Sequence, residues 1–223
     1  EIINADSMQI YKNLDVGTAK PSAEERQGIP HYLLDFLEPE MPYSVADFTA
    51  AADPLIRKLT ARGKLPVVVG GTGLYITSLL NGMNFAPEKI DPTIRARLQA
   101  RADAEGGATL YAQLQSIDPD YAAQVHPNNL PRVIRALEIY ELTGIPMSQH
   151  RTPTQADAPY DFSLYAVDWP RAELHARINQ RVDQMLANGL MQEVQALLDS
   201  GVSEDAQSMQ GLGYKELLPC LHG

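Results

Sequence analysis

The chain has 223 residues, of which 44% are hydrophobic and 21% are charged, and its formal net charge is −10. This composition is typical of a globular protein with one large domain, or one domain carrying an insertion, and it excludes wholesale disorder. No run of about 18 apolar residues is present, so no membrane-spanning helix is expected. The single cysteine, Cys220, excludes an internal disulfide and suits the cytoplasm, while the acidity by itself argues against a nucleic-acid partner.

The first 85 residues alternate between predicted strands and predicted helices. Strands are expected at residues 2–6, 32–37 and 64–69, from short apolar or β-branched runs. Ser44 is typical of a helix N-cap, with Asp47 three residues later, and Gly63 is expected to end that helix. A further helix is expected from Leu74. This alternation indicates a parallel α/β sheet.

The pattern changes near residue 84 and returns near residue 161. Helices are predicted at residues 91–105, 109–117, 119–125 and 130–143, and Gly144 is expected to close the last of them. Residues 151–159 are expected to form a linker, 162–167 a strand, and 171–188 a long helix. An apolar face of that helix is predicted for Leu174, Ile178, Val182, Met185 and Leu186. We therefore expect an α/β core in residues 1–85 and 161–223, interrupted by a helical block in residues 86–160.

The carboxyl ends of two predicted strands carry the best candidates for chemistry. Asp6 and Ser7 directly follow the first strand, and ligands of parallel α/β proteins bind beyond the carboxyl ends of strands. The turn Gly70-Gly71-Thr72-Gly73 follows another strand and precedes a helix, where backbone N–H groups favour an anion. Each feature also has a purely structural interpretation, Asp6 as the cap of a turn and the glycines as a tight connection.

Other motifs are less specific on their own. Residues 17–21 predict a flexible loop with one hydroxyl group and one cation, and residues 211–215 either contact a base or phosphate or turn the chain into a last helix. Arginines recur at helical spacing, either as a solvated face or as an anion-binding face. These arginines are Arg95, Arg97 and Arg101, then Arg132 and Arg135, then Arg177 and Arg181. The five histidines form no pair at metal-ligand spacing, so no protein zinc site is expected.

Taken in chain order, these motifs resemble those of the tRNA isopentenyl (prenyl) transferase family, the tRNA dimethylallyltransferases. The shared set comprises Asp6-Ser7-x-Gln9-x-Tyr11, Gly17-Thr18-Ala19-Lys20-Pro21, residues 31–48 with Asp35, Pro39, Tyr43-Ser44 and Asp47-Phe48, Gly70-Gly71-Thr72-Gly73-Leu74-Tyr75, and Arg132-x-x-Arg135-Ala136-Leu137-Glu138. The ordered set runs through essentially the whole chain and is far more specific than any one of its members.

The resemblance implies a P-loop-kinase-like parallel α/β core with an inserted all-helical domain that binds the anticodon stem-loop of tRNA. The implied reaction transfers a dimethylallyl group from dimethylallyl diphosphate to N6 of the adenosine beside the anticodon, in tRNAs reading codons that begin with U. Mg²⁺ is the implied cofactor. The resemblance further implies a cytoplasmic monomer with no membrane and no protein partner.

Roles for individual residues are also implied by the match to the family's motifs. Catalytic roles fall on Asp6 as general base, on Thr72, and on Arg181, which is associated with the diphosphate donor. Contacts to tRNA are implied for Asp6, Ser7, Met8, Gln9, Thr72, Arg95, Pro131, Arg132, Val133, Ile134, Arg135, Gln210, Gly211, Leu212, Gly213, Tyr214 and Lys215.

Two parts of the family pattern do not occur in the 223 residues. A Gly-Pro-Thr-x-x-Gly-Lys-Thr loop, which holds the donor diphosphate and where Mg²⁺ is expected, would precede Glu1. Basic, aromatic helices would follow Gly223. The resemblance therefore leaves open whether these 223 residues are active by themselves.

Three other functions stay open as well. An adenylate isopentenyltransferase would act on free AMP, ADP or ATP, although a free nucleotide needs no helical block to clamp an anticodon. A P-loop nucleotide kinase is not expected to carry Asp6-Ser7-x-Gln9. A non-catalytic tRNA-binding module would fit a chain without a P-loop motif.

Overall fold

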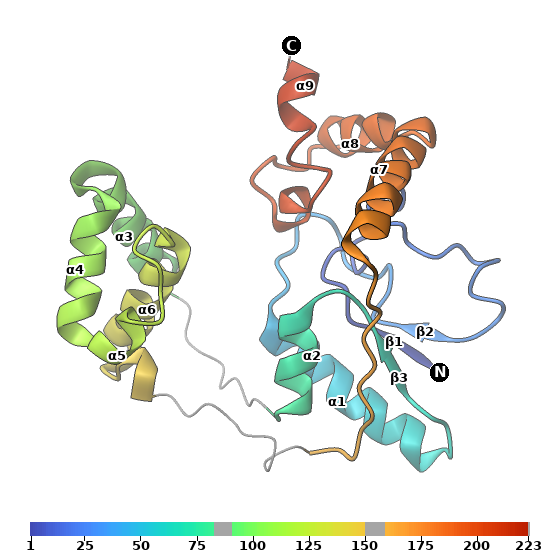
Figure 1. Ribbon diagram of the computed structural model, residues 1–223, viewed down its shortest axis with the longest axis horizontal. Helices are drawn as coiled ribbons and strands as arrows, with labels where there is room; N and C mark the ends of the chain where they lie inside the picture. The colour runs from blue at the N-terminus through green and yellow to red at the C-terminus, as the bar shows by residue number, and fades with distance from the viewer. Residues whose placement is uncertain (83–90, 150–158, 223) are drawn as a thin grey trace. The chain divides into compact units, whose positions relative to one another are not determined.

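The structure, a computed structural model, describes residues 1–82, 91–149 and 159–222 (Figure 1). The chain divides into two compact units. Residues 1–83 and 155–223 form one, here called the core unit, and residues 84–154 form the other, here called the helical unit. Most of the predicted linker at 151–159 lies outside the described residues.

A parallel sheet with strand order β2-β1-β3 organises the core unit. In its register, Ile2 pairs with His31 on one side and with Val67 on the other. The α/β class predicted from the sequence is confirmed. The elements of this unit are β1 (Ile2–Asn4), β2 (His31–Tyr32), α1 (Val45–Ala61), β3 (Val67–Val69), α2 (Gly73–Leu80), α7 (Arg171–Ala187), α8 (Leu190–Asp199), the 3₁₀ helix η3 (Gln207–Gln210) and α9 (Leu218–His222).

The hydrophobic core of this unit joins the two ends of the chain. Ile3 of β1 and Phe48 of α1 belong to the same buried cluster as Val194 of α8 and Met209 of η3. Phe48 also stacks on Tyr75 of α2, with ring centroids 4.4 Å apart. Complete burial of one large apolar side chain stabilises the folded state by about 1.5–3 kcal/mol. The segments that carry the candidate site at both ends of the sequence are therefore packed on one core.

Helix α1 begins as its sequence predicts. The Ser44 hydroxyl oxygen accepts the backbone N–H of Asp47, and the Asp47 carboxylate accepts the backbone N–H of Ser44, which is a complete capping box. The chain leaves the helix at Arg62, and Gly63 has a φ of +68°. Both ends confirm the predicted signals.

The predicted strand at residues 32–37 is wrong beyond its first residue. Strand β2 ends at Tyr32, because Leu33 and Asp35 both have a φ of +56°, outside the extended region. Further along the predicted strand, Leu37 forms an isolated parallel β-bridge with Tyr11. The apolar run could not signal these left-handed positions, which only the tertiary structure imposes.

The predicted strand at residues 162–167 is also absent. A strand exists only when a neighbouring strand pairs with it, and no described strand pairs with this segment. Tyr165 and Val167 are almost fully exposed. The following helix α7 is confirmed, but four members of its predicted apolar face are exposed by 40–48%, namely Leu174, Ile178, Val182 and Leu186.

The helical unit contains α3 (Pro92–Glu105), α4 (Gly107–Ile117), α5 (Pro119–Ala122), α6 (Leu130–Thr143) and the 3₁₀ helix η1 (Met147–Gln149). Its core is a separate buried cluster that includes Leu98, Leu110 and Leu137. The helices predicted at residues 91–105, 109–117 and 130–143 are confirmed, whereas the one predicted at 119–125 ends at Ala122. Local caps define two of the starts, because Asp91 and Asn129 each accept a backbone N–H there. Among the described residues, no helix has the length and apolar character needed to cross a membrane.

Candidate functional site

The turn after β1 fixes one oxygen of Asp6 and leaves the other available. Asp6 Oδ1 accepts the backbone N–H groups of Met8, at 2.8 Å, and of Gln9, at 3.2 Å. These contacts hold the carboxylate in place by a local Asx turn. Oδ2 makes no hydrogen bond with any other described residue. This oxygen is therefore free to accept a proton or a hydrogen bond from a ligand.

Thr72 connects the glycine-rich turn to the same site. Its Oγ1 accepts the backbone N–H of Ser7 at 2.9 Å and donates to Ser7 Oγ at 3.1 Å. Although Thr72 is the N-cap residue of α2, its side chain makes no capping hydrogen bond to that helix. The hydroxyl group is committed to the Asp6 turn instead.

Gly70 permits the two turns to approach each other. A Cβ atom at this position would lie 2.2 Å from the carbonyl carbon of Ala5, far inside contact distance. At Gly71 a Cβ atom would lie 3.6 Å from Asp6 Oδ2, so the available oxygen faces the glycine-rich turn. Gly70 thus fits the structural interpretation of this turn as a tight connection, and an anion contact by the turn stays a prediction.

The third part of the site comes from the turn after η3. A Cβ atom at Gly211 would lie 2.8 Å from Met8 Sδ, so this turn lies directly against the Asp6 turn. Leu212 is largely exposed. The structure thus brings together three of the predicted segments, residues 6–9, Thr72 and residues 210–215.

The loop at residues 17–21 was predicted to be flexible, with one hydroxyl group and one cation, and the structure shows both groups bonded within the protein. Thr18 Oγ1 donates to Leu14 O at 2.6 Å. Lys20 is nearly buried and donates to Tyr11 O at 2.6 Å and to the Asp35 carboxylate at 2.8 Å. Gln9 donates its side-chain amide to Thr18 O at 3.0 Å. Both polar groups of the loop are used internally, and the loop in turn positions Gln9.

Glu193 of α8 is a residue of this site that the sequence did not reveal. Its carboxylate accepts the backbone N–H groups of Asp15, Val16 and Gly17 at 2.7–3.0 Å. It also accepts the hydroxyl group of Tyr214 at 2.5 Å. Glu193 and Asp15 are 178 positions apart, and nothing local distinguishes this glutamate from other helix-surface carboxylates.

Tyr214 has a structural role in this arrangement. Its ring is buried, and a Cβ atom at Gly17 would lie 2.6 Å from it. Burial, and then the hydrogen bond to Glu193, raise the pKa of Tyr214 well above its usual range. The ring is therefore not available to stack on a base, which corrects the interpretation of residues 211–215 as a base contact through this ring. A contact of this turn's backbone with RNA stays a prediction.

In the helical unit, only part of the predicted RNA-binding stretch faces solvent. Pro131 and Arg132 are exposed, and Arg135 is half-buried. Val133 and Ile134 are buried in the core of the unit, so their side chains cannot contact RNA. Helical periodicity explains the difference, because consecutive residues of a helix point to different faces.

Arg181 lies on the exposed surface of α7 and makes no ion pair or hydrogen bond with the other described residues. Its neighbour one turn earlier, Arg177, lies over the ring of Trp169 at 3.7 Å. A cation without a partner is available for an anionic ligand. The role of Arg181 toward the diphosphate stays a prediction.

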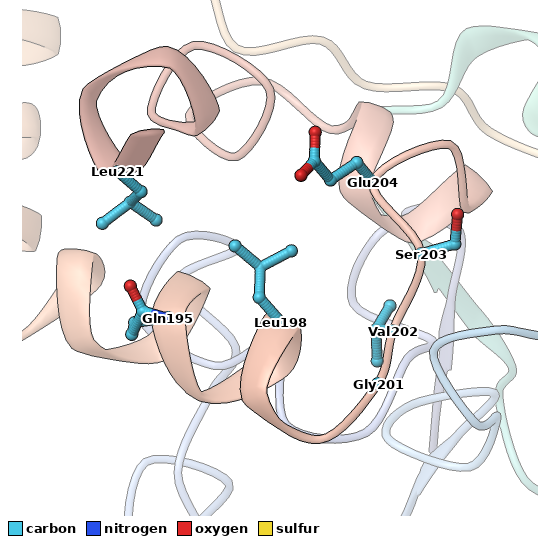
Figure 2. A pocket seen from close by; sticks show the side chains of 7 residues that line it. All are labelled: Gln195, Leu198, Gly201, Val202, Ser203, Glu204 and Leu221. Atoms are coloured by element: carbon cyan, nitrogen blue, oxygen red, sulfur yellow. The ribbon is translucent and has the colours of Figure 1, made fainter. Parts of the chain in front are cut away.

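A hollow of about 460 Å³ lies elsewhere, between α8, the loop after it and α9 (Figure 2). Figure 2 shows Leu198 from α8, Leu221 from α9, and the loop that carries Ser203 and Glu204. The residues that line it are Gln195, Leu198, Gly201, Val202, Ser203, Glu204 and Leu221. None of the predicted site residues lines it, so the candidate site is the Asp6 turn and not this hollow.

The fold is that of an α/β protein joined to a separate helical unit, and its candidate ligand site lies at the carboxyl ends of parallel strands. Comparison with known families is more specific, because the family model described as IPP transferase matches residues 9–223. The chain belongs to the IPP transferase family.

Relatives and solved structures agree with this assignment. The chain is 50% identical to tRNA dimethylallyltransferase 1 of Trichlorobacter lovleyi, over all of this chain and 73% of the relative. It is similar to the tRNA isopentenylpyrophosphate transferase of Bacillus halodurans, with 43% identity and a TM-score of 0.68 over all of this chain and 69% of that chain. A eukaryotic dimethylallyltransferase described as acting on tRNA matches with 30% identity and a TM-score of 0.72, over 99% of this chain and 56% of that chain.

Proposed function

We propose that this chain transfers a dimethylallyl group from dimethylallyl diphosphate to N6 of the adenosine beside the anticodon of tRNA. The single observation that carries the proposal is the Asp6 carboxylate, fixed through Oδ1 and open at Oδ2 beside the glycine-rich turn. The names of the relatives support the same reaction. The substrates would be tRNAs that read codons beginning with U, and the family resemblance is the basis for this choice.

Asp6 answers a specific chemical difficulty of this reaction. The lone pair of the adenine N6 amine is delocalised into the ring, so the amine is a poor nucleophile. A carboxylate at hydrogen-bond distance would select the amine by accepting its N–H. It would then take the proton as the new C–N bond forms. General-base assistance of this kind is worth about 10²–10⁴ in rate.

The departing diphosphate makes the second chemical demand. The diphosphate departs from the allylic carbon and takes the electron pair of the broken C–O bond. The negative charge of the departing diphosphate must therefore be stabilised. Arg181 is the proposed contact from this chain. Mg²⁺ would supply further neutralisation of the diphosphate. No cluster of three or more metal-ligating side chains occurs among the described residues, so this part of the chain does not itself form a metal cage.

The helical unit is proposed to bind the anticodon stem-loop through exposed basic side chains such as Arg132. The target base must leave the stack of the anticodon loop, which costs a few kcal/mol. Contacts to the RNA backbone would offset that cost. A cytoplasmic monomer without membrane or protein partners remains the expectation.

The test compares acceptors under one set of conditions. The protein is incubated with labelled dimethylallyl diphosphate and Mg²⁺, together with a tRNA reading a codon that begins with U, the same tRNA with guanosine at the target position, or AMP. Nucleosides are then identified by mass spectrometry after digestion. We expect prenyl-adenosine only from the first acceptor.

Each alternative function predicts a different result when the same protein is also assayed for phosphate transfer from labelled ATP to AMP and for tRNA binding. Prenylation of AMP would replace the proposal with adenylate isopentenyltransferase activity. Phosphate transfer from ATP to a nucleotide would indicate a kinase. Tight tRNA binding without any product would indicate a binding module.

A further inference from the structure

The carboxylate of Glu193 is fully occupied by contacts inside the core unit. Its two oxygens accept hydrogen bonds from the backbone N–H groups of Asp15, Val16 and Gly17 and from the hydroxyl group of Tyr214. Each oxygen accepts two of these bonds, which fills the usual capacity of a carboxylate. Glu193 is therefore not available to bind a substrate, and any part that it has in a reaction must be indirect.

The loop that Glu193 holds in turn holds the side chain of Gln9. Directly after the three N–H donors, the backbone carbonyl groups of Thr18 and Ala19 accept the side-chain amide of Gln9, at 3.0 and 3.3 Å. The Glu193 carboxylate and the Gln9 amide thus bind consecutive parts of one loop, the first through its N–H groups and the second through its C=O groups. A shift of this loop would therefore be passed on to Gln9.

The second segment that Glu193 holds, the turn at residues 210–215, lies against Met8. Tyr214 of this turn has a buried ring and donates its hydroxyl group to Glu193 at 2.5 Å. At Gly211 of the same turn, a Cβ atom would lie 2.8 Å from Met8 Sδ, so the backbone of the turn is packed on this side chain. A shift of the turn would therefore be passed on to Met8.

Met8 and Gln9 are the two residues whose backbone N–H groups fix Asp6. Asp6 Oδ1 accepts these N–H groups at 2.8 and 3.2 Å. Glu193 thus supports, through two separate segments, both donors that orient the proposed general base. Such support matters for a catalytic group, because a misplacement of about 1 Å can cost about 100-fold in rate.

We propose that Glu193 is a positioning residue of the transfer reaction and fixes where the Asp6 carboxylate lies. This inference rests on the proposed function, because it takes Asp6 as the general base. Glu193 contacts neither substrate. It acts by holding in place the two segments against which Met8 and Gln9 lie.

The variant Glu193→Gln separates positioning from stability. Glutamine keeps the shape of the side chain, but an amide nitrogen replaces one acceptor oxygen and cannot accept an N–H group. The measurement is the rate constant of a single turnover, with saturating dimethylallyl diphosphate and Mg²⁺ and with folded protein in saturating excess over tRNA. Under these conditions a smaller folded fraction leaves the rate constant unchanged, whereas a misplaced Asp6 lowers it. We expect a rate constant about 10–100-fold below that of the unaltered protein, with the Kd for tRNA within a few-fold of the unaltered value.

Asp199 provides a matched control on the same helix. It is exposed at the end of α8 and accepts a hydrogen bond from the side chain of Gln195 at 2.8 Å. Asp199→Asn removes the same charge without disturbing the segments that Glu193 holds. We expect this variant to keep the unaltered rate constant. A fall as large as that in Glu193→Gln would assign the effect to charge alone and would overturn the inference.

Tyr214→Phe covers the case in which Glu193→Gln fails to fold, as judged by circular dichroism. Phenylalanine keeps the buried ring but lacks the hydroxyl group that binds Glu193, so the turn is held less firmly. We expect its rate constant to fall about fivefold, which corresponds to the loss of one hydrogen bond.

Two results would contradict the inference and one would contradict its premise. If Glu193→Gln folds, an unaltered rate constant in that variant overturns the positioning role. If it does not fold, an unaltered rate constant in Tyr214→Phe does so. Failure of the unaltered protein to form prenyl-adenosine in tRNA would instead overturn the proposed function.

Discussion

At the scale of single residues, the site depends on side chains that hold other side chains. Asp6 is oriented by two backbone N–H groups of its own turn, and Ser7 is held by Thr72 from another strand end. The sequence indicated Asp6 and Thr72 separately, because both follow predicted strands. It did not indicate that the Thr72 hydroxyl binds Ser7, since a threonine at a helix start is ordinarily a cap.

Thr72→Val tests that contact. Valine has nearly the same shape but leaves the backbone N–H of Ser7 without its acceptor, a loss of about 1–3 kcal/mol. We expect turnover with tRNA to fall roughly tenfold or more, since the Asp6 turn loses its anchor. Thr72→Ser keeps the hydroxyl group and should remain close to the unaltered rate. Equal rates for the valine and serine variants would contradict the anchoring role.

Glu138 gives the helical unit a dependence on pH. Burial of this α6 side chain raises the pKa of its carboxyl group. The hydrogen bonds that it accepts from Arg95 and Arg135 lower the pKa by more than burial raises it, so the net pKa is below its usual range. A lowered pKa in the folded state stabilises the fold above the unfolded value of about 4.3. That stabilisation is lost as the pH falls through the folded value.

We therefore expect the urea midpoint to fall as the pH is lowered from about 5 toward 3, and to fall less steeply in Glu138→Gln. Unfolding followed by circular dichroism across this pH range measures both. An acid dependence that is the same in the two proteins would show that the Glu138 ion pairs do not link protonation to folding.

At the scale of elements, helices were predictable where local caps define them. Asp91 and Asn129 accept backbone N–H groups at the starts of α3 and α6, and Gly144 ends α6 in a left-handed conformation. Strands were less predictable, because a strand needs a partner that lies far away in the sequence. Residues 162–167 have strand composition but pair with no described strand.

The loop that follows the first turn shows the same limit. Its motif was visible at residues 17–21, but its partners Glu193 and Tyr214 lie far along the chain. No local pattern in α8 marks one glutamate as the acceptor of three consecutive backbone N–H groups. The motif could therefore be predicted from the sequence, but its contacts with Glu193 and Tyr214 could not.

Gly17→Ala tests how firmly that loop is held. The new Cβ atom would lie 2.6 Å from the Tyr214 ring, which is buried and bonded to Glu193. Such overpacking costs about 1–3 kcal/mol, so we expect a lower urea midpoint. Gly73→Ala is the matched control, because a Cβ atom there meets nothing within 4 Å. A Gly17→Ala protein as stable as the control would mean that the loop moves aside at no cost.

At the scale of the whole molecule, the net charge of −10 first argued against nucleic acid. The distribution of charge alters that conclusion. In the helical unit, Arg95 and Arg132 are exposed and Arg135 is half-buried. Net charge governs solubility and long-range attraction, whereas contacts to phosphate depend on a few local cations.

The double variant Arg132→Ala with Arg135→Ala tests this local view. Each lost phosphate contact lowers the slope of log Kd against log salt by about one. We expect weaker tRNA binding and a flatter salt dependence, measured by filter binding between about 50 and 200 mM salt. A weaker Kd with an unchanged slope would show that these side chains only pack the helix.

The single-turnover rate of Asp6→Asn with tRNA and dimethylallyl diphosphate tests directly whether Asp6 is the base. Asparagine keeps an Oδ1 acceptor for the N–H groups of Met8 and Gln9, so the turn is preserved while the base is lost. We expect a rate at least about 100-fold below that of the unaltered protein, and a Kd for tRNA within a few-fold of the unaltered protein's Kd. A near-normal rate would contradict the central claim that Asp6 accepts the N6 proton.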